Sequence, residues 1–207
     1  RSEELVRIDC DHLEEARQSR ASGALTASGT MAVCRRLDIP MAITCGMGGI
    51  GDLRGEELCP DLPALMNIPV ALISTSPKDM LDRPATLDWL RRHGVHTAGE
   101  PCTGYLFCGE PVALELPLSS CNNEAAVRRL TANGGLLLLN PIPEKERVQD
   151  RSILVDAIKA GKQAEAEGHY YHPAANGEID RRTGGYSSRI QLESIQQNYL
   201  LAKSIMD

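Results

Sequence analysis

The alternation of short apolar runs with helical patterns constrains the fold of this chain more than any other feature. Three runs rich in aliphatic residues, MAIT, IPVALIS and GGLLLLN, end at Thr44, Ser74 and Asn140. Because apolar strands separated by helices form parallel sheets covered on both faces, this order predicts a three-layer α/β/α fold with a largely parallel central sheet. No internal repeat or low-complexity linker interrupts the pattern, so we expect residues 1–207 to form a single α/β domain.

The expected helices lie where apolar periodicity coincides with polar starts and glycine stops. A glycine directly after the last turn, as at Gly94, is a typical helix end. We expect helices at about Ser28–Arg36, Asp61–Met66, Ala85–His93, NNEAAVRRLTANGG, Ser152–Glu167 and Ser187–Ile205. The segment GHYYHPAANGEIDRRTGG is predicted to be a polar bridge in which Tyr170 and Tyr171 lie in a loop.

Charge and composition restrict the classes of ligand. The formal net charge is −6 and no block of Lys or Arg is present, which argues against binding of nucleic acid or of a membrane surface. Phe107 and Trp89 are the only residues of their types, so stacking platforms for bases are not expected. The 7 cysteines are scattered without a CxxC motif or a signal-like start, which indicates reduced thiols in a cytoplasmic protein. Small solutes or proteins are therefore the expected partners.

Glycines and carboxylates follow the strand that ends at Thr44. In CGMGGIGD, residues 45–52, glycine lets backbone N–H groups approach an anion at the edge of the sheet where open α/β folds bind ligands. An anion-binding loop and a plain tight loop fit this pattern equally well. The carboxylates between Asp52 and Asp61 have a spacing that a divalent metal can use, but spacing alone favours a solvated acidic turn.

Three further motifs present polar groups next to predicted strands or helices. In NPIPE, residues 140–144, two prolines hold Asn140 in a rigid turn that is either a ligand wall or structural. TGGYS, residues 183–187, forms a glycine turn whose polar start serves as a cap or as a ligand contact. Lys78, in VALISTSPKDMLD, follows a strand end, and position alone favours a solvated charge over a nucleophile. The histidines form no recognisable catalytic arrangement.

Taken together, these motifs resemble the pseudouridine-5'-phosphate glycosidases, also called the indigoidine synthase A family. The likeness runs from about Ala21 to the C-terminus, and NGGLLLLNPIPE is its most specific part. It implies an indigoidine synthase A-like fold, a divalent metal that is usually manganese, and a homo-oligomer, expected to be a trimer. It also implies reversible cleavage of the C–C glycosidic bond of pseudouridine 5'-phosphate to uracil and ribose 5-phosphate.

The resemblance assigns the nucleophile and several contacts to positions in this chain. In the mechanism attributed to the family, a lysine amine attacks C1' of the opened ribose and forms an imine, and Lys78 matches that lysine. Thr44 matches a phosphate-contacting threonine and Asp61 an aspartate of the substrate loop. The metal-binding aspartate aligns with Glu57, and a substrate-contacting serine falls at Cys59.

The remaining matches complete the expected substrate site. Gln191 aligns with an asparagine on the last helix, Arg7 lies near a phosphate-binding lysine, and Asn140 belongs to the NPIPE wall. The general-acid glutamate of the family lies in an N-terminal segment that has no counterpart in this sequence. Because the chain opens without methionine, we expect either a fragment or a divergent member with altered or lost activity. The alternatives to the glycosidase are therefore an impaired sugar-phosphate-binding homologue and a related Schiff-base enzyme acting on another phosphorylated sugar.

Overall fold

Four parallel strands form the centre of the molecule in a computed structural model that describes residues 5–51, 59–132 and 134–207. In spatial order they are β3 (Met41–Ile43), β5 (Ala71–Ser74), β8 (Leu136–Leu139) and β7 (His96–Gly99). The three apolar runs that predicted strands supply β3, β5 and β8, which confirms them. The edge strand β7 was not predicted, because VHTAG is short and only half apolar.

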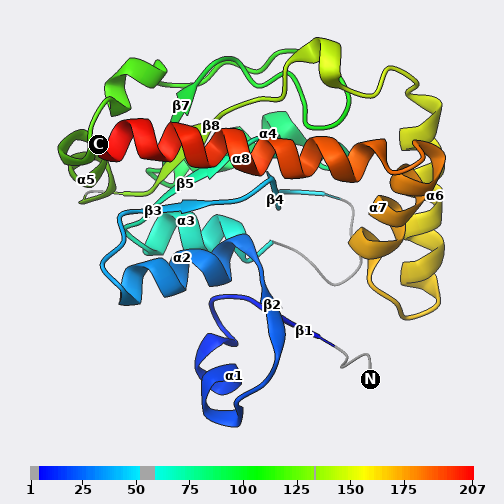
Figure 1. The fold of residues 1–207 in the computed structure, drawn as a ribbon, viewed down its shortest axis with the longest axis horizontal. Helices are drawn as coiled ribbons and strands as arrows, with labels where there is room; N and C mark the ends of the chain where they lie inside the picture. The colour runs from blue at the N-terminus through cyan, green and yellow to red at the C-terminus, as the bar shows by residue number, and fades with distance from the viewer. Residues whose placement is uncertain (1–4, 52–58, 133) are drawn as a thin grey trace.

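Helices cover both faces of the sheet (Figure 1), and alternation along the strands places one set of side chains on each face. Ala42, Leu72 and Leu137 pack toward α2 (Ala27–Arg36), α3 (Asp61–Asn67) and α4 (Arg83–Arg92). Met41, Ile73 and Leu138 pack toward α5 (Glu124–Ala132) and α8 (Tyr186–Met206). The chain therefore has the predicted three-layer α/β/α fold, and the five helices named here agree with the sequence-based boundaries to within a few residues.

Two of the central strands continue beyond their ends as a second parallel pair. After a break, β4 (Gly46–Met47) pairs with β6 (Ser76–Pro77). The backbone N–H of Thr75 donates to the Cys45 carbonyl at 2.8 Å, and that of Lys78 donates to the Met47 carbonyl at 3.2 Å. This extension places the glycine loop beside Lys78 at the carboxyl end of the sheet.

A small N-terminal unit lies below the sheet in Figure 1. It consists of β1 (Val6–Ile8), α1 (Leu13–Ser19) and β2 (Gly23–Leu25), and the two strands pair in parallel. This unit was not predicted, because α1 buries no residue and therefore lacks an apolar stripe.

The predicted polar bridge is wrong, because most of it forms a helix. After α6 (Ser152–Ala166), the chain turns into α7 (Tyr171–Arg182), which packs against α6 at one end of the molecule (Figure 1). Tyr171, Ala175 and Ile179 recur every four residues and are buried on one face. Pro173 lies in the first turn, where its missing N–H has no intrahelical acceptor. The helix was not predicted because most residues of the segment are polar and only three of them form the apolar stripe.

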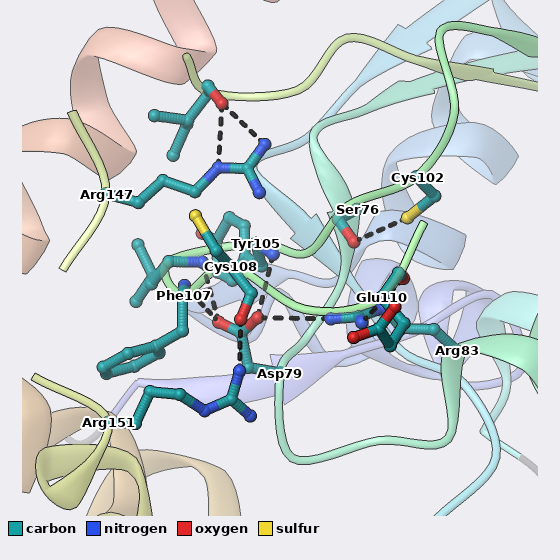
Figure 2. A network of polar contacts seen from close by, with 12 residues as sticks. Ser76, Asp79, Arg83, Cys102, Tyr105, Phe107, Cys108, Glu110, Arg147 and Arg151 are labelled. Atoms are coloured by element: carbon teal, nitrogen blue, oxygen red, sulfur yellow. Dashed lines mark hydrogen bonds and ion pairs between the residues drawn. The ribbon is translucent and has the colours of Figure 1, made fainter. Parts of the chain in front are cut away.

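The buried carboxylate of Asp79 fixes the loop at residues 105–107. The side chains of this loop pack in an apolar cluster with residues of α6 and α7. Asp79 accepts hydrogen bonds from the backbone N–H groups of Tyr105, Leu106 and Phe107 at 2.9, 2.7 and 3.2 Å (Figure 2). Arg83 lies 3.8 Å from the same carboxylate, only 4% of which is exposed. Burial raises the pKa of the Asp79 carboxyl, while the three N–H donors and the Arg83 charge oppose that shift. Because both of its oxygens accept hydrogen bonds, the Asp79 side chain anchors the backbone of residues 105–107.

Two arginines fix neighbouring turns by donating to carbonyl oxygens. Arg151 donates to the Cys108 carbonyl, and Arg147 donates twice to the Ile142 carbonyl, at 2.9 and 2.7 Å (Figure 2). The structural role of the NPIPE turn is thereby evident. Two short 3₁₀ helices, η1 (Leu118–Cys121) and η2 (Glu144–Glu146), complete the secondary structure of the described residues.

The state of the cysteines and the lengths of the helices can be compared with the sequence. All 7 cysteines lie within the described residues and are free thiols, as predicted. Within the described ranges, no helix combines the length and the apolar character needed to cross a membrane.

Two helical glycines test the contact between α6 and α7. A Cβ added at the buried Gly161 would lie 2.6 Å from the Tyr171 ring, whereas one added at Gly177 would meet nothing within 4 Å. We expect Gly161→Ala to destabilise the protein by about 1–3 kcal/mol through overpacking. Gly177→Ala should stabilise it by about 0.5–1 kcal/mol through helix propensity. Urea unfolding measures both, and equal effects of the same sign would contradict the close packing.

The Asp79 anchor gives a second stability prediction. Asp79→Ala leaves three backbone N–H groups unpaired and Arg83 without its carboxylate, so we expect a loss of about 3–5 kcal/mol. Asp88→Ala is the control, because Asp88 makes only exposed ion pairs on α4, which are worth at most about 1 kcal/mol. Chemical denaturation compares the two, and similar losses would show that Asp79 is not an anchor.

Candidate active site

A cavity of about 630 Å³ opens at the carboxyl ends of β3 and β5. Its walls come from β1, β2, the glycine loop and the start of α7. The structure brings five of the predicted site residues to this cavity, namely Arg7, Thr44, Cys59, Asp61 and Lys78. Their convergence from separate parts of the chain makes this cavity the candidate active site.

Asp61 joins two elements beneath the cavity. One carboxylate oxygen accepts from the backbone N–H of Ser28 in α2 at 2.9 Å, and the other accepts from that of Gly48 at 2.8 Å. The side chain is buried, with 6% of the residue exposed. A Cβ at Gly48 would lie 2.0 Å from the Cys59 sulfur, so only glycine fits here. The carboxylate therefore fixes the course of the glycine loop.

Lys78 occupies the turn between β6 and α4. The turn is closed by the Leu81 N–H, which donates to the Lys78 carbonyl at 3.0 Å, and Asp82 caps α4 through the Ala85 N–H at 2.9 Å. A Cβ at Gly46 would lie 3.2 Å from Lys78 Cγ and 2.8 Å from the Tyr105 ring. Glycine at position 46 thus lets the lysine stem pass between the loop and the tyrosine into the cavity.

The wall behind Lys78 consists of polar but uncharged groups. The Tyr105 hydroxyl donates to Gln191 Oε1 at 2.9 Å, and the Cys45 thiol donates to the Gln191 carbonyl at 3.5 Å. Burial raises the pKa of the Cys45 thiol and of the Tyr105 hydroxyl, so both groups are neutral at physiological pH. Gln191 supports this wall and is not among the residues that line the cavity, so its predicted substrate contact stays a prediction.

Asn140 also supports the site from outside. Its Nδ2 donates to Asn198 Oδ1 at 2.9 Å, and Asn198 Nδ2 donates to the Thr44 carbonyl at 2.7 Å. The pair ties the NPIPE turn and α8 to the end of β3. Asn140 is not among the residues that line the cavity, so its direct contact with substrate stays a prediction. Asn198 is fully buried and was not predicted, because one asparagine in an amphipathic helix gives no distinct signal.

The predicted metal ligand cannot be placed. Glu57 lies outside the described residues, as do Asp52 and Glu56. Among the residues that the structure describes, no group of three or more His, Cys, Asp or Glu side chains has the arrangement of a metal site. The assignment of Glu57 therefore stays a prediction.

Sequence reasoning missed the part of the cavity that α6 and α7 supply. Glu165, His169, Tyr170, Tyr171 and His172 line it, although the tyrosines and histidines were assigned to a loop without function. Burial, with the charges of Lys78 and Arg7 as further causes, lowers the pKa of His172 to about 3. The four-residue spacing of the apolar side chains of α7 is the signal that would have predicted this wall.

Comparison with known proteins supports the relationship that the motifs indicated. The profile of the family described as "Indigoidine synthase A like protein" matches residues 2–206. Curated pseudouridine-5'-phosphate glycosidases from Methylobacterium nodulans and Saccharopolyspora erythraea are 28% and 30% identical over 99% and 98% of this chain. That of Escherichia coli is 29% identical over 89% of this chain. The chain spans 64%, 71% and 63% of the length of these three relatives.

Two solved structures share the fold. The prealnumycin C-glycosynthase AlnA, solved with ribulose 5-phosphate, has a TM-score of 0.76 at 23% identity, with 98% of this chain and 69% of the other covered. An indigoidine synthase A-like protein from Thermotoga maritima has a TM-score of 0.77 at 20% identity, with 98% and 70% covered. With the profile match over residues 2–206, this chain belongs to the indigoidine synthase A-like family.

Proposed function

We propose that this chain acts on the C–C glycosidic bond of pseudouridine 5'-phosphate, or of a closely related C-glycoside of a sugar phosphate, with Lys78 as the nucleophile. The observation that carries the proposal is the position of Lys78 in the cavity, at the carboxyl end of the sheet and beside Arg7 and Thr44. The names of the curated relatives support the substrate class.

The size and charge of the cavity suit a phosphorylated sugar. A volume of about 630 Å³ lies in the usual range of small-molecule sites. Arg7 supplies a guanidinium that can pair with a phosphate group through two N–H donors. The Thr44 hydroxyl supplies a further hydrogen-bonding group without adding charge. We assign the phosphate to Arg7 and Thr44 and the sugar carbon C1' to Lys78.

The chemistry assigned to Lys78 is imine formation with the opened sugar. With ribose 5-phosphate, the neutral amine attacks the C1' aldehyde, a C–N bond forms, and the carbonyl oxygen leaves as water with the two amine hydrogens. With the C-glycoside, amine attack breaks the bond from C1' to the ring oxygen, which takes a proton. The nitrogen lone pair then forms the C=N bond as the bond between C1' and the base breaks, and the base carbon keeps the bonding electrons and takes a proton from water. The amine must be unprotonated for the attack, so the reaction should slow as the pH falls.

A catalytically impaired sugar-phosphate-binding homologue is the second candidate. Cys59 favours it, because a thiol is a weaker hydrogen-bonding group than the serine hydroxyl that the family resemblance implies at this position. Cys59 is also buried beside Gly48, with only 6% of the residue exposed, which leaves little of it for contact with a substrate. A related Schiff-base enzyme acting on another phosphorylated sugar is the remaining alternative, and the homotrimer stays a prediction.

Reductive trapping tests the role of Lys78. We expect borohydride with ribose 5-phosphate to attach one sugar phosphate to the protein, and peptide mass spectrometry to locate it on Lys78. Lys78→Met should abolish the adduct, since the substitution removes the amine. Lys159→Met is the control, because Lys159 lies on the surface of α6 with 73% of its side chain exposed.

The outcomes separate the candidates. An adduct on Lys78 together with release of uracil from pseudouridine 5'-phosphate supports the glycosidase. An adduct with ribulose 5-phosphate but no uracil release favours the enzyme acting on another sugar. Thermal stabilisation by ribose 5-phosphate with no adduct on Lys78 contradicts the proposed nucleophile and favours the binding protein.

Manganese is proposed to bind through Glu57, and this role rests on the family resemblance alone. The described residues do not supply a metal site, because both oxygens of Asp61 are engaged by backbone N–H groups. No step of the proposed chemistry is therefore assigned to a metal.

Thermal unfolding tests the manganese assignment. At a concentration about a hundredfold above its dissociation constant, Mn²⁺ should raise the melting temperature by about 5 °C or more. Glu57→Ala should remove this shift. Glu115→Ala should keep it, because Glu115 pairs with His96 at the start of β7, the edge strand of the sheet. A wild-type protein that shows no shift in millimolar Mn²⁺ would exclude the site.

A further inference from the structure

His172 lines the cavity and has no part in the proposed function. It is the second residue of α7 and meets the Tyr171 ring edge to face with the ring centres 5.5 Å apart. Its Nδ1 is sealed from solvent and has no hydrogen-bond partner in the part of the chain that the structure describes. Because Nδ1 is enclosed while the ring lines the cavity, Nε2 is the nitrogen available to a ligand.

The charged groups around His172 favour its neutral form. Lys78, after β6, and Arg7, from β1, are the two charges that act on the imidazole, and both are positive. Glu165 of α6 also lines the cavity, but its carboxylate lies 3.5 Å from the Lys162 ammonium. Lys162 in turn lies 5.8 Å from the centre of the Tyr171 ring. Burial and the two cations lower the pKa of His172 to about 3, so the ring is neutral at pH 7.

Burial of Nδ1 selects the tautomer of the neutral ring. A neutral imidazole carries one N–H donor and one lone-pair acceptor. A buried N–H without an acceptor is rarer in proteins than an under-used acceptor, and it loses a full hydrogen bond. The proton is therefore expected on Nε2, where the cavity can supply an acceptor. His172 then presents a donor beside Lys78 without adding a third positive charge.

We propose that His172 is a neutral hydrogen-bond donor whose Nε2–H binds the carbonyl oxygen of the opened sugar that Lys78 attacks. Its chemical role rests on the proposed function. As the C–N bond forms, the carbonyl π electrons move to the oxygen, and the Nε2–H stabilises the developing negative charge. His172 keeps its proton throughout, because the oxygen leaves as water with the two hydrogens of the Lys78 amine. A neutral imidazole acting as an electrophile has precedent in enzyme chemistry.

Two substitutions separate the donor from the space that the ring fills. His172→Phe keeps a planar ring but removes the N–H, so reductive trapping of ribose 5-phosphate on Lys78 should slow by about a hundredfold. His172→Gln retains a neutral N–H donor and should recover at least about a tenth of the wild-type rate. His96→Phe is the matched control at the edge strand β7, and its trapping rate should equal that of the wild type.

Binding is measured separately with ribitol 5-phosphate, which has no carbonyl group. Its dissociation constant should change by less than about threefold in His172→Phe, because the hydrogen bond forms to the reacting oxygen. Equal trapping rates in the wild type and His172→Phe would overturn the proposal while leaving the proposed function intact. Equally slow trapping in His172→Phe and His172→Gln would assign the ring a packing role and would also overturn it.

Nuclear magnetic resonance tests the proposal even if no adduct forms. In ¹⁵N-histidine-labelled protein, the long-range ¹H–¹⁵N spectrum should show His172 protonated at Nε2 and unchanged between pH 8 and about pH 5. A His172 ring that titrates near its ordinary pKa, or that carries its proton on Nδ1, would contradict the proposal. Absence of an adduct in the wild type would instead count against the proposed role of Lys78.

Discussion

The site depends on the two hydrogen bonds that the Asp61 carboxylate accepts from separate segments. One fixes the first turn of α2 and the other fixes the glycine loop, so α2, α3 and the loop after β4 meet at one buried group. Because the loop runs through Gly46 and Gly48, its path also determines the space left for Lys78 and Cys59. Asp61 therefore has a structural role, because it holds α2 and the glycine loop together beneath the cavity. Its contact with substrate stays a prediction.

The groups in and around the cavity differ in charge. Lys78 and Arg7 are positive, while Cys45, Tyr105 and His172 are polar groups that stay neutral. Under the proposed function, the two cations favour an anionic sugar phosphate, while the neutral groups add no further positive charge beside the Lys78 amine. Asp79 supports the site indirectly, because it accepts a hydrogen bond from the backbone N–H of Tyr105 (Figure 2). The Tyr105 ring packs beside Gly46 in the glycine loop.

Most of the central fold follows from the sequence, and the reasons are local. The buried strands are continuous apolar runs such as LLLL in β8, and α4 carries both an Asp cap and a Gly94 stop. These signals are local, because each one depends on only a few neighbouring residues. The edge strand β7 has a weak pattern because it is short and only half apolar, and the N-terminal unit has one because α1 buries no residue. Both gain their structure from pairing with neighbouring strands.

The residues of the candidate site were predictable only where they belong to a recognisable sequence motif. Lys78, Thr44 and Asp61 follow strand ends or begin a helix, and the structure places all three at one cavity. His172 was not predictable, because its importance depends on α7 folding back onto α6 and bringing the ring near Lys78 and Arg7. Asn140 and Gln191 lie close to the site in the fold, yet their contacts are with Asn198 and Tyr105, which sequence spacing does not reveal.

The central claim is that Lys78 forms a covalent bond with the sugar, and a crystal structure of the protein soaked with ribose 5-phosphate tests it most directly. The account predicts continuous electron density from Lys78 Nζ to C1', with the phosphate beside Arg7 and Thr44. Ribose 5-phosphate bound in the cavity with no bond to Lys78, or with its phosphate at the lysine, would contradict it.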